Sequence, residues 1–244
     1  MRTLLDDEFA PTTTTIGFLR ASIDDAVVGL RTWRERLGNR PVSEPVDGLR
    51  AGLIALQPLV GGARPRELLV AVGSEWTAYF DCRLGSTDAV TTIGYLSQAM
   101  ETAGVAITSA PHTVGSPGHH QGQYGAVQFE LFGHGDPSEL NSVRSVELVE
   151  DGGHWVFQAI GEVQPFEDLS RYQARSIRER FTSEMLETYC RALGIDAFEP
   201  AAYGPRAFLV RSDVRLPADP VFMTFEEAQK WFDIHPGEAA ALPG

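Results

Sequence analysis

The chain has 244 residues, of which 43% are apolar and 9% are aromatic, and this is enough for one sizeable hydrophobic core. Its 33 acidic and 20 basic residues give a formal net charge of −13, which disfavours binding to nucleic acid. The amino-terminal stretch becomes acidic at Asp6, no apolar run approaches the roughly 18 residues of a membrane span, and two cysteines are too few for a disulfide framework. We therefore expect a cytoplasmic protein with no membrane partner and no nucleic-acid partner.

The first sixty residues predict a strand, a helix and a second strand. Residues 13–20 have strand composition, and Ser22 then caps a helix that carries one apolar stripe and ends at Gly38. The stretch 39–47 contains two prolines and is expected to be a loop, whereas the apolar run 49–59 is expected to be a buried strand.

Two segments, 66–81 and 142–160, have the clearest local pattern in the chain. Each predicts a β-hairpin, because a glycine beside serine or aspartate supplies the positive φ angle of a tight turn and β-branched and aromatic residues flank it. Each second strand begins at a tryptophan, Trp76 in the first segment and Trp155 in the second. If the segments belong to duplicated units, the two tryptophans should have equivalent burial.

The remaining elements connect these hairpins and follow them. A second helix is expected from about Ser86 to Gly104, followed by a short strand and by a loop rich in glycine, proline and histidine. An alternating strand is expected at 126–132. The last third is predicted to be mainly helical, with helix caps at Ser170, Thr182 and Thr224. A returning strand is expected at 206–210.

Together these elements predict an α+β fold with an antiparallel sheet and helices packed on one face. The order of helix, strand and hairpin recurs, so we interpret residues 13–81 and 86–160 as two related halves, possible products of duplication. The halves form one sheet domain, 1–168, and a helical carboxyl-terminal region, 169–244, packs on that domain.

The sequence lacks the common catalytic motifs. It has no glycine-rich phosphate loop ending in Lys-Ser/Thr, no His-Glu-x-x-His, no Cys-x-x-Cys and no Gly-x-Ser-x-Gly. Lys230 is the only lysine, which argues against Schiff-base chemistry. No catalytic residue is assigned, no cofactor is expected, and an enzyme is the less favoured class.

Four histidines, His112, His119, His120 and His134, lie in or near the glycine-rich loop. Imidazole is a common ligand of transition metals, so the adjacent pair His119 and His120 forms an alternative polar cluster. Adjacent residues rarely point at one ion, however, and the loop 113–124 contains neither carboxylate nor thiolate. We expect no bound metal and interpret the loop as an insertion between strands.

The main candidate binding site lies where the first hairpin runs into the second helix. Strand alternation places Trp76 on one face and Tyr79 and Asp81 on the other, with Arg83 and Asp88 close behind at the turn. Asp81 and Arg83 could pair with each other, hold a ligand or cap the helix, and capping is the commonest of these roles.

A further acidic group follows the second hairpin, at Glu162, Glu167 and Asp168. Carboxylates can serve acid-base chemistry, but no partner residue is evident in the sequence. We interpret this group as a solvated acidic face.

Five short motifs carry a resemblance: EWTAYFD at 75–81, GSTD at 85–88, WVFQA at 155–159, RFTSEML at 180–186 and ALGID at 192–196. Over about residues 15–200 the chain resembles an uncharacterised family of acidic actinobacterial cytoplasmic proteins. That family has no known activity, so the resemblance implies no catalytic residue. The general organisation is also similar to that of bacterial toxin-immunity proteins, which is an analogy at the level of the fold.

Two functions from different classes are therefore carried forward. The first is non-enzymatic binding, with immunity-like sequestration of a basic protein partner. The second is a small-molecule enzyme, hydrolase-like, whose pocket in the concave sheet would use His119, His120 and Asp81. A closed cleft with histidine and carboxylate would favour the enzyme, and an exposed acidic and aromatic patch would favour the binding protein. The sequence does not predict an oligomeric state.

Overall fold

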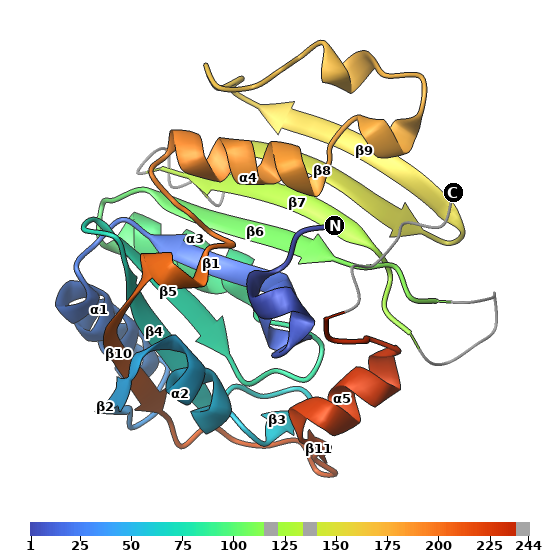
Figure 1. The fold of residues 1–244 in the computed structure, drawn as a ribbon. Coiled ribbons are helices and arrows are strands. Elements are labelled where there is room, and N and C mark those ends of the chain that lie inside the picture. Colours follow the sequence, from blue (N-terminus) through green and yellow to red (C-terminus); the bar gives the residue numbers. More distant parts are fainter. Residues whose placement is uncertain (115–121, 134–140, 238–244) are drawn as a thin grey trace.

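The computed structural model describes residues 1–114, 122–133 and 141–237, and every structural statement below concerns these ranges. It confirms the α+β class: five α-helices surround a nine-stranded antiparallel sheet with the strand order β2-β10-β4-β5-β1-β6-β7-β8-β9 (Figure 1). The strands of this sheet are β1 (Thr15–Leu19), β2 (Val42–Asp47), β4 (Arg66–Val72), β5 (Trp76–Asp81), β6 (Gly104–Ala110), β7 (Ala126–Phe132), β8 (Ser142–Asp151), β9 (His154–Gly161) and β10 (Tyr203–Arg211). A small second sheet pairs β3 (Leu59–Val60) with β11 (Phe222–Met223).

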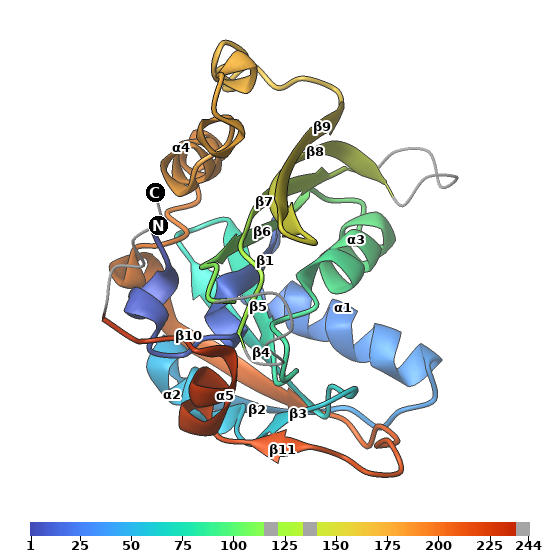
Figure 2. The same cartoon turned by 90° about the vertical axis from the view of Figure 1, so that its right-hand side faces the viewer.

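Helices cover both faces of the large sheet. On one face lie α1 (Ile23–Arg36) and α3 (Ala89–Ala99), the two helices that were predicted to share a face. The opposite face packs against α2 (Gly48–Ala55), α4 (Ser183–Ala192), α5 (Phe225–Phe232) and the amino-terminal segment (Leu4–Asp7) (Figure 2). The prediction of helices on one face therefore omitted a second helical layer. No helix in the described ranges is long and apolar enough to cross a membrane.

Two sequence predictions before the first hairpin were wrong. The stretch 39–47, expected as a loop, contains β2, which tolerates Pro45 because it is the edge strand and pairs only with β10 in the described sheet. The run 49–59, expected as one strand, forms α2 up to Ala55, and only its last residue, Leu59, belongs to a strand, β3. Its leucines at 49, 53 and 56 are all buried at helical spacing, a pattern that a short apolar run does not separate from a strand.

Both predicted hairpins are confirmed. The strands β4 and β5 pair in register from Glu67 opposite Asp81 to Val72 opposite Trp76, and β8 pairs with β9 from Arg144 opposite Gly161 to Asp151 opposite His154. Trp76 is buried on a central strand, whereas Trp155 is half-buried on the edge strand β9. The equivalent burial expected of a duplicated unit is therefore not observed.

The carboxyl-terminal region is part of the sheet as well as packing on it. The returning strand predicted at 206–210 is confirmed as β10, and it lies between β2 and β4. The cap at Thr182 is formed, and Thr224 and Glu227 form a complete capping box at the start of α5. The helix expected after Ser170 is present only as two short 3-10 turns, at Arg171–Gln173 and Ile177–Glu179.

Candidate functional site

The predicted cluster at the end of β5 is brought together in part. Tyr79 and Asp81 point to the α1/α3 face and are fully buried, and Arg83 and Asp88 follow within the turn to α3. Trp76 lies on the opposite face, as alternation predicts, and its indole Nε1 donates to the carbonyl of Leu193 at 3.2 Å. Trp76 therefore takes no part in the cluster.

Asp81 organises the backbone at the start of α3. Its Oδ1 accepts the backbone N–H of Arg83 and its Oδ2 accepts that of Asp88, each at 2.9 Å. Burial raises the pKa of the Asp81 carboxyl to about 6, although these two N–H groups act in the opposite direction. The side chain of Arg83 pairs with Asp88 at 3.2 Å and not with Asp81. Of the three roles considered for Asp81, the geometry fits capping.

A buried ion pair that the sequence reading missed lies beside Asp81. Arg34 on α1 donates from Nε and Nη2 to the two carboxylate oxygens of Glu67 on β4, at 2.7 Å for Nε, and both side chains are almost completely buried. The hydroxyl of Tyr79 donates to Glu67 at 2.7 Å and accepts from Thr92 on α3 at 3.2 Å. No pattern in the sequence pairs a residue of α1 with one of β4, because tertiary packing alone brings them together.

This cluster is a closed structural network. Arg64 extends this network toward the surface, because its Nη1 contacts Asp88 at 2.6 Å and the hydroxyl of Thr92 at 3.3 Å. The carboxylates of Asp81 and Glu67 have protein donors for both oxygens. The donors therefore hold helices α1 and α3 on the sheet, and neither carboxylate has an oxygen left without a protein donor.

The histidine and cysteine side chains give no reactive centre within the described part of the chain. His119, His120 and His134 lie outside the described residues, and the Nδ1 of His112 accepts the backbone N–H of Gly125 at 3.2 Å. Among described residues no group of three or more His, Cys, Asp or Glu side chains could hold a metal ion. Burial raises the pKa of Cys82 to about 11, so this thiol stays protonated at neutral pH.

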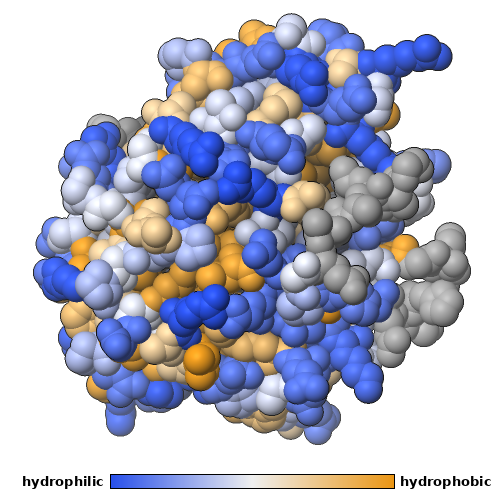
Figure 3. Space-filling model, in the orientation of Figure 1, coloured by the Kyte–Doolittle hydropathy of each residue, from blue (hydrophilic) through white to orange (hydrophobic). Residues whose placement is uncertain are grey.

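A hollow opens on the opposite side of the sheet, beside the amino-terminal segment. This amino-terminal hollow has a volume of about 560 Å³ and is lined by residues of the first turn, α2 and the segments around 198–200 and 236–237. Figure 3 shows apolar surface recessed among hydrophilic side chains on this face. Leu5 and Phe198 contribute apolar lining, and polar side chains stand around them.

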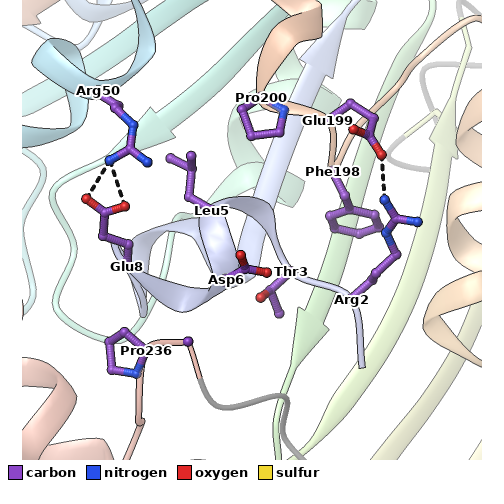
Figure 4. Close-up of a pocket in the computed structure, with 11 residues that line it drawn as sticks. Arg2, Thr3, Leu5, Asp6, Glu8, Arg50, Phe198, Glu199, Pro200 and Pro236 are labelled. Atoms are coloured by element: carbon purple, nitrogen blue, oxygen red, sulfur yellow. Dashed lines mark hydrogen bonds and ion pairs between the residues drawn. The ribbon is translucent and has the colours of Figure 1, made fainter.

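Among the described residues, the charges of the hollow form two ion pairs and leave one carboxylate without a partner. Arg50 contacts both carboxylate oxygens of Glu8, at 2.5 and 2.6 Å, on one side of the hollow. Arg2 pairs with Glu199 on the other side (Figure 4). Asp6 lies between them, and its carboxylate makes no hydrogen bond or ion pair with any described residue.

The backbone that carries Asp6 is strained. Leu5, Asp6 and Asp7 have φ angles of 59, 48 and 63°, which is the left-handed region, and no glycine relieves the cost. Each such residue costs roughly 1–2 kcal/mol. The packing of Leu4, which is fully buried, and the N–H of Gly237 bonded to the carbonyl of Asp6 at 2.9 Å hold the segment in place. Strain of this kind is frequent at binding sites.

A third feature is the part of the sheet that α3 does not cover. Phe129, Val146 and Phe157 on β7, β8 and β9 pack against α4 and its neighbours, so the alternate residues face the other way. No described helix covers the outer strands β8 and β9 on that side (Figure 2). We call this surface the acidic sheet face, and its residues are Gln128, Glu130, Ser145, Glu147, Gln158 and Ile160.

The acidic sheet face holds two carboxylates that pair with no cation among the described residues. Glu130 and Glu147 are half-buried diagonal neighbours on adjacent strands. Within the described part of the chain each has a neutral hydrogen-bond donor, Ser142 at 3.0 Å for Glu130 and Gln128 at 3.1 Å for Glu147. Burial raises the pKa of Glu130, and the negative charge of Glu147 raises it further. The strands β7, β8 and β9 contain one arginine, Arg144, and no lysine, and the side chain of Arg144 lies on the opposite face.

The acidic group after the second hairpin is only partly a solvated face. Glu162 and Asp168 are exposed, but Glu167 is buried and receives two hydrogen bonds from Arg144, at 2.9 and 2.6 Å. The hydroxyl of Tyr172 adds a third at 2.7 Å. These donors lower the pKa of Glu167 against the effect of burial, so it stays ionised and structural.

Comparisons with known proteins identified no relative of this chain. No protein-family model matches the chain, no curated protein matches it, and no solved structure matches it.

Proposed function

We propose that this protein is a non-enzymatic binding protein that holds a basic protein partner on the acidic sheet face. The observation that carries the proposal is the pair Glu130 and Glu147, two half-buried carboxylates that share a surface with no cation from the described residues. Keeping like charges together at partial burial costs stability, and a cation supplied by a partner removes that cost.

The composition of the surface supports a protein partner. Ile160 is 63% exposed beside Gln158, so apolar contact area and hydrogen-bonding groups accompany the two carboxylates. The net charge of −13 attracts a basic protein from a distance and repels phosphate backbones. Sequestration of a toxic basic protein in the cytoplasm, as in immunity proteins, is the most concrete form of this proposal.

The alternative function, a small-molecule enzyme that uses His119, His120 and Asp81, has no specific support. Asp81 is enclosed in the network with Arg83 and Asp88, and it does not line the amino-terminal hollow. The two histidines lie outside the described residues.

The test compares the wild-type protein with a Glu130→Gln/Glu147→Gln variant as baits for proteins of the source cell. The wild type should retain a basic protein at low salt and release it at about 0.5 M salt, where the Debye length falls to several ångströms. The double variant should fail to retain it. The matched control, Asp219→Asn/Glu226→Gln, removes the same two charges from exposed positions elsewhere and should behave as the wild type.

A stability measurement separates lost binding from lost folding. Because Glu130 and Glu147 repel each other, the double variant should be as stable as the wild type or up to about 1 kcal/mol more stable. Equal retention of the same protein by wild type and variant would contradict the proposal. Recovery of nucleic acid, or turnover of a small substrate by the isolated protein, would also contradict it.

A further inference from the structure

We propose that the amino-terminal hollow binds the side chain of an arginine or lysine, with Asp6 as the carboxylate that pairs with its charge. The inference rests on the proposed function, because the basic partner would supply that side chain. It adds a second contact region on the opposite face of the sheet from the acidic sheet face.

The charge balance of the hollow selects a cation. Both arginines are already neutralised, Arg50 by the two oxygens of Glu8 and Arg2 by Glu199 and by Glu187 at 3.1 Å. Asp6 is the carboxylate of the lining that has no partner among the described residues. An incoming anion would meet the Asp6 carboxylate and would have to displace a formed ion pair, whereas a cation finds an acceptor without displacing a side chain of any described residue.

The walls of the hollow suit a charged group on an apolar stem. Leu5, Phe198 and Pro200 line it between the two ion pairs, and Figure 4 shows the Asp6 carboxylate beside them. Arginine and lysine bury their methylene stems on such surfaces while their charged ends find a polar group. A volume of about 560 Å³ admits one such side chain together with water.

The backbone conformation holds Asp6 ready for this contact. The left-handed turn at Leu5–Asp7 is anchored by Leu4 in the core and by the bond from Gly237. A carboxylate on a fixed turn loses little freedom on binding, which favours affinity. Asparagine tolerates the left-handed region, so Asp6→Asn removes the charge and keeps the turn.

The test uses N-acetyl-arginine-methylamide as the probe and follows backbone amide shifts of the whole chain by NMR. We expect saturable shifts at residues 5–8 and at Phe198 and Glu199, which line the hollow and carry a backbone N–H. Asp6→Asn should weaken binding about tenfold, as expected for loss of a charge-assisted hydrogen bond. The control Asp219→Asn, which removes an exposed carboxylate elsewhere, should leave the affinity unchanged. The neutral isostere N-acetyl-citrulline-methylamide should bind at least about tenfold more weakly than the arginine probe.

Two further results would overturn the inference. The first is that the wild-type protein binds the arginine and citrulline probes with equal affinity. The second is that Asp6→Asn binds the arginine probe with the wild-type affinity. Tighter binding of N-acetyl-glutamate-methylamide would assign the hollow to anions and would overturn it as well. The variant Glu130→Gln/Glu147→Gln should bind the arginine probe as the wild type does, so loss of partner capture by that variant reports on the acidic sheet face alone.

Discussion

The buried pair of Arg34 and Glu67 allows a sharp test of what holds α1 on the sheet. The side chain of Arg34 is 4% exposed and that of Glu67 is not exposed at all. With about 4 Å between the charge centres and an effective dielectric constant of about 20, their attraction is about 4 kcal/mol. Removing one partner leaves the other charge buried and unpaired, which costs roughly 3–5 kcal/mol.

We therefore expect Arg34→Met and Glu67→Leu each to lower the free energy of unfolding by about 3–5 kcal/mol. The cost in Arg34→Met should fall near the lower limit, because Tyr79 still donates to Glu67 at 2.7 Å. The double variant removes both charges and replaces them with apolar groups of similar length. It should lie within about 2 kcal/mol of the wild type, or exceed it.

Urea unfolding at pH 7 measures these changes in a double-mutant cycle. The slope and midpoint are fitted for the wild type, the two single variants and the double variant. The reasoning requires a coupling energy of several kcal/mol between the two sites. If the single variants each cost less than about 1 kcal/mol, or if the double variant loses the sum of the single losses, then the pair does not behave as a buried ion pair.

Three further predictions concern other parts of the fold. Because the pKa of Asp81 is about 6 in the folded protein and lies near 3.8 in the unfolded chain, its contribution to stability should fall by about 2.4 kcal/mol as the pH rises from 4 to 7. The stability of Asp81→Asn relative to the wild type should thus increase over that range, and a constant difference in unfolding free energy would contradict this. Gly161 has a φ of 92° and a Cβ there would lie 2.3 Å from the carbonyl oxygen of Val143, so Gly161→Ala should destabilise the protein by at least about 2 kcal/mol in thermal unfolding. Thr224→Ala removes the capping box of α5 and should cost about 1 kcal/mol, whereas an unchanged midpoint would show that packing alone fixes this helix.

Local chemistry made the hairpins and helix caps predictable. The glycine turns after β4 and β8, and the cap of α5 at Thr224, follow from residues within four positions of each other. The failures at β2 and α2 have the opposite cause. Pro45 is acceptable because β2 is an edge strand of the described sheet, and α2 packs closely on β4 because Gly52 leaves room for the side chain of Leu68. Neither fact is visible before the sheet is assembled.

The candidate site was likewise predictable only where its residues are close together in the sequence. Strand alternation and short spacing placed Tyr79, Asp81 and Asp88 together, since all belong to one strand and the turn that follows it. Glu67 was missed because it enters the site through pairing with the next strand and with α1. Asp6 was noted only as an acidic residue, because no residue pattern signals three successive left-handed residues without glycine.

The position of β10 in the sheet determines when the sheet can be completed during synthesis of the chain. β2 has β10 as its partner in the described sheet, and β4 needs β10 to cover one of its two edges. Neither β2 nor β4 can complete its pairing with β10 until Arg211 has left the ribosome. During that interval the apolar strand β4 presents an open edge, which is a template for pairing with other chains. Translation speed and chaperone access over residues 72–211 should therefore govern the yield of folded protein, because β10, the last strand of the large sheet to be synthesised, lies between β2 and β4.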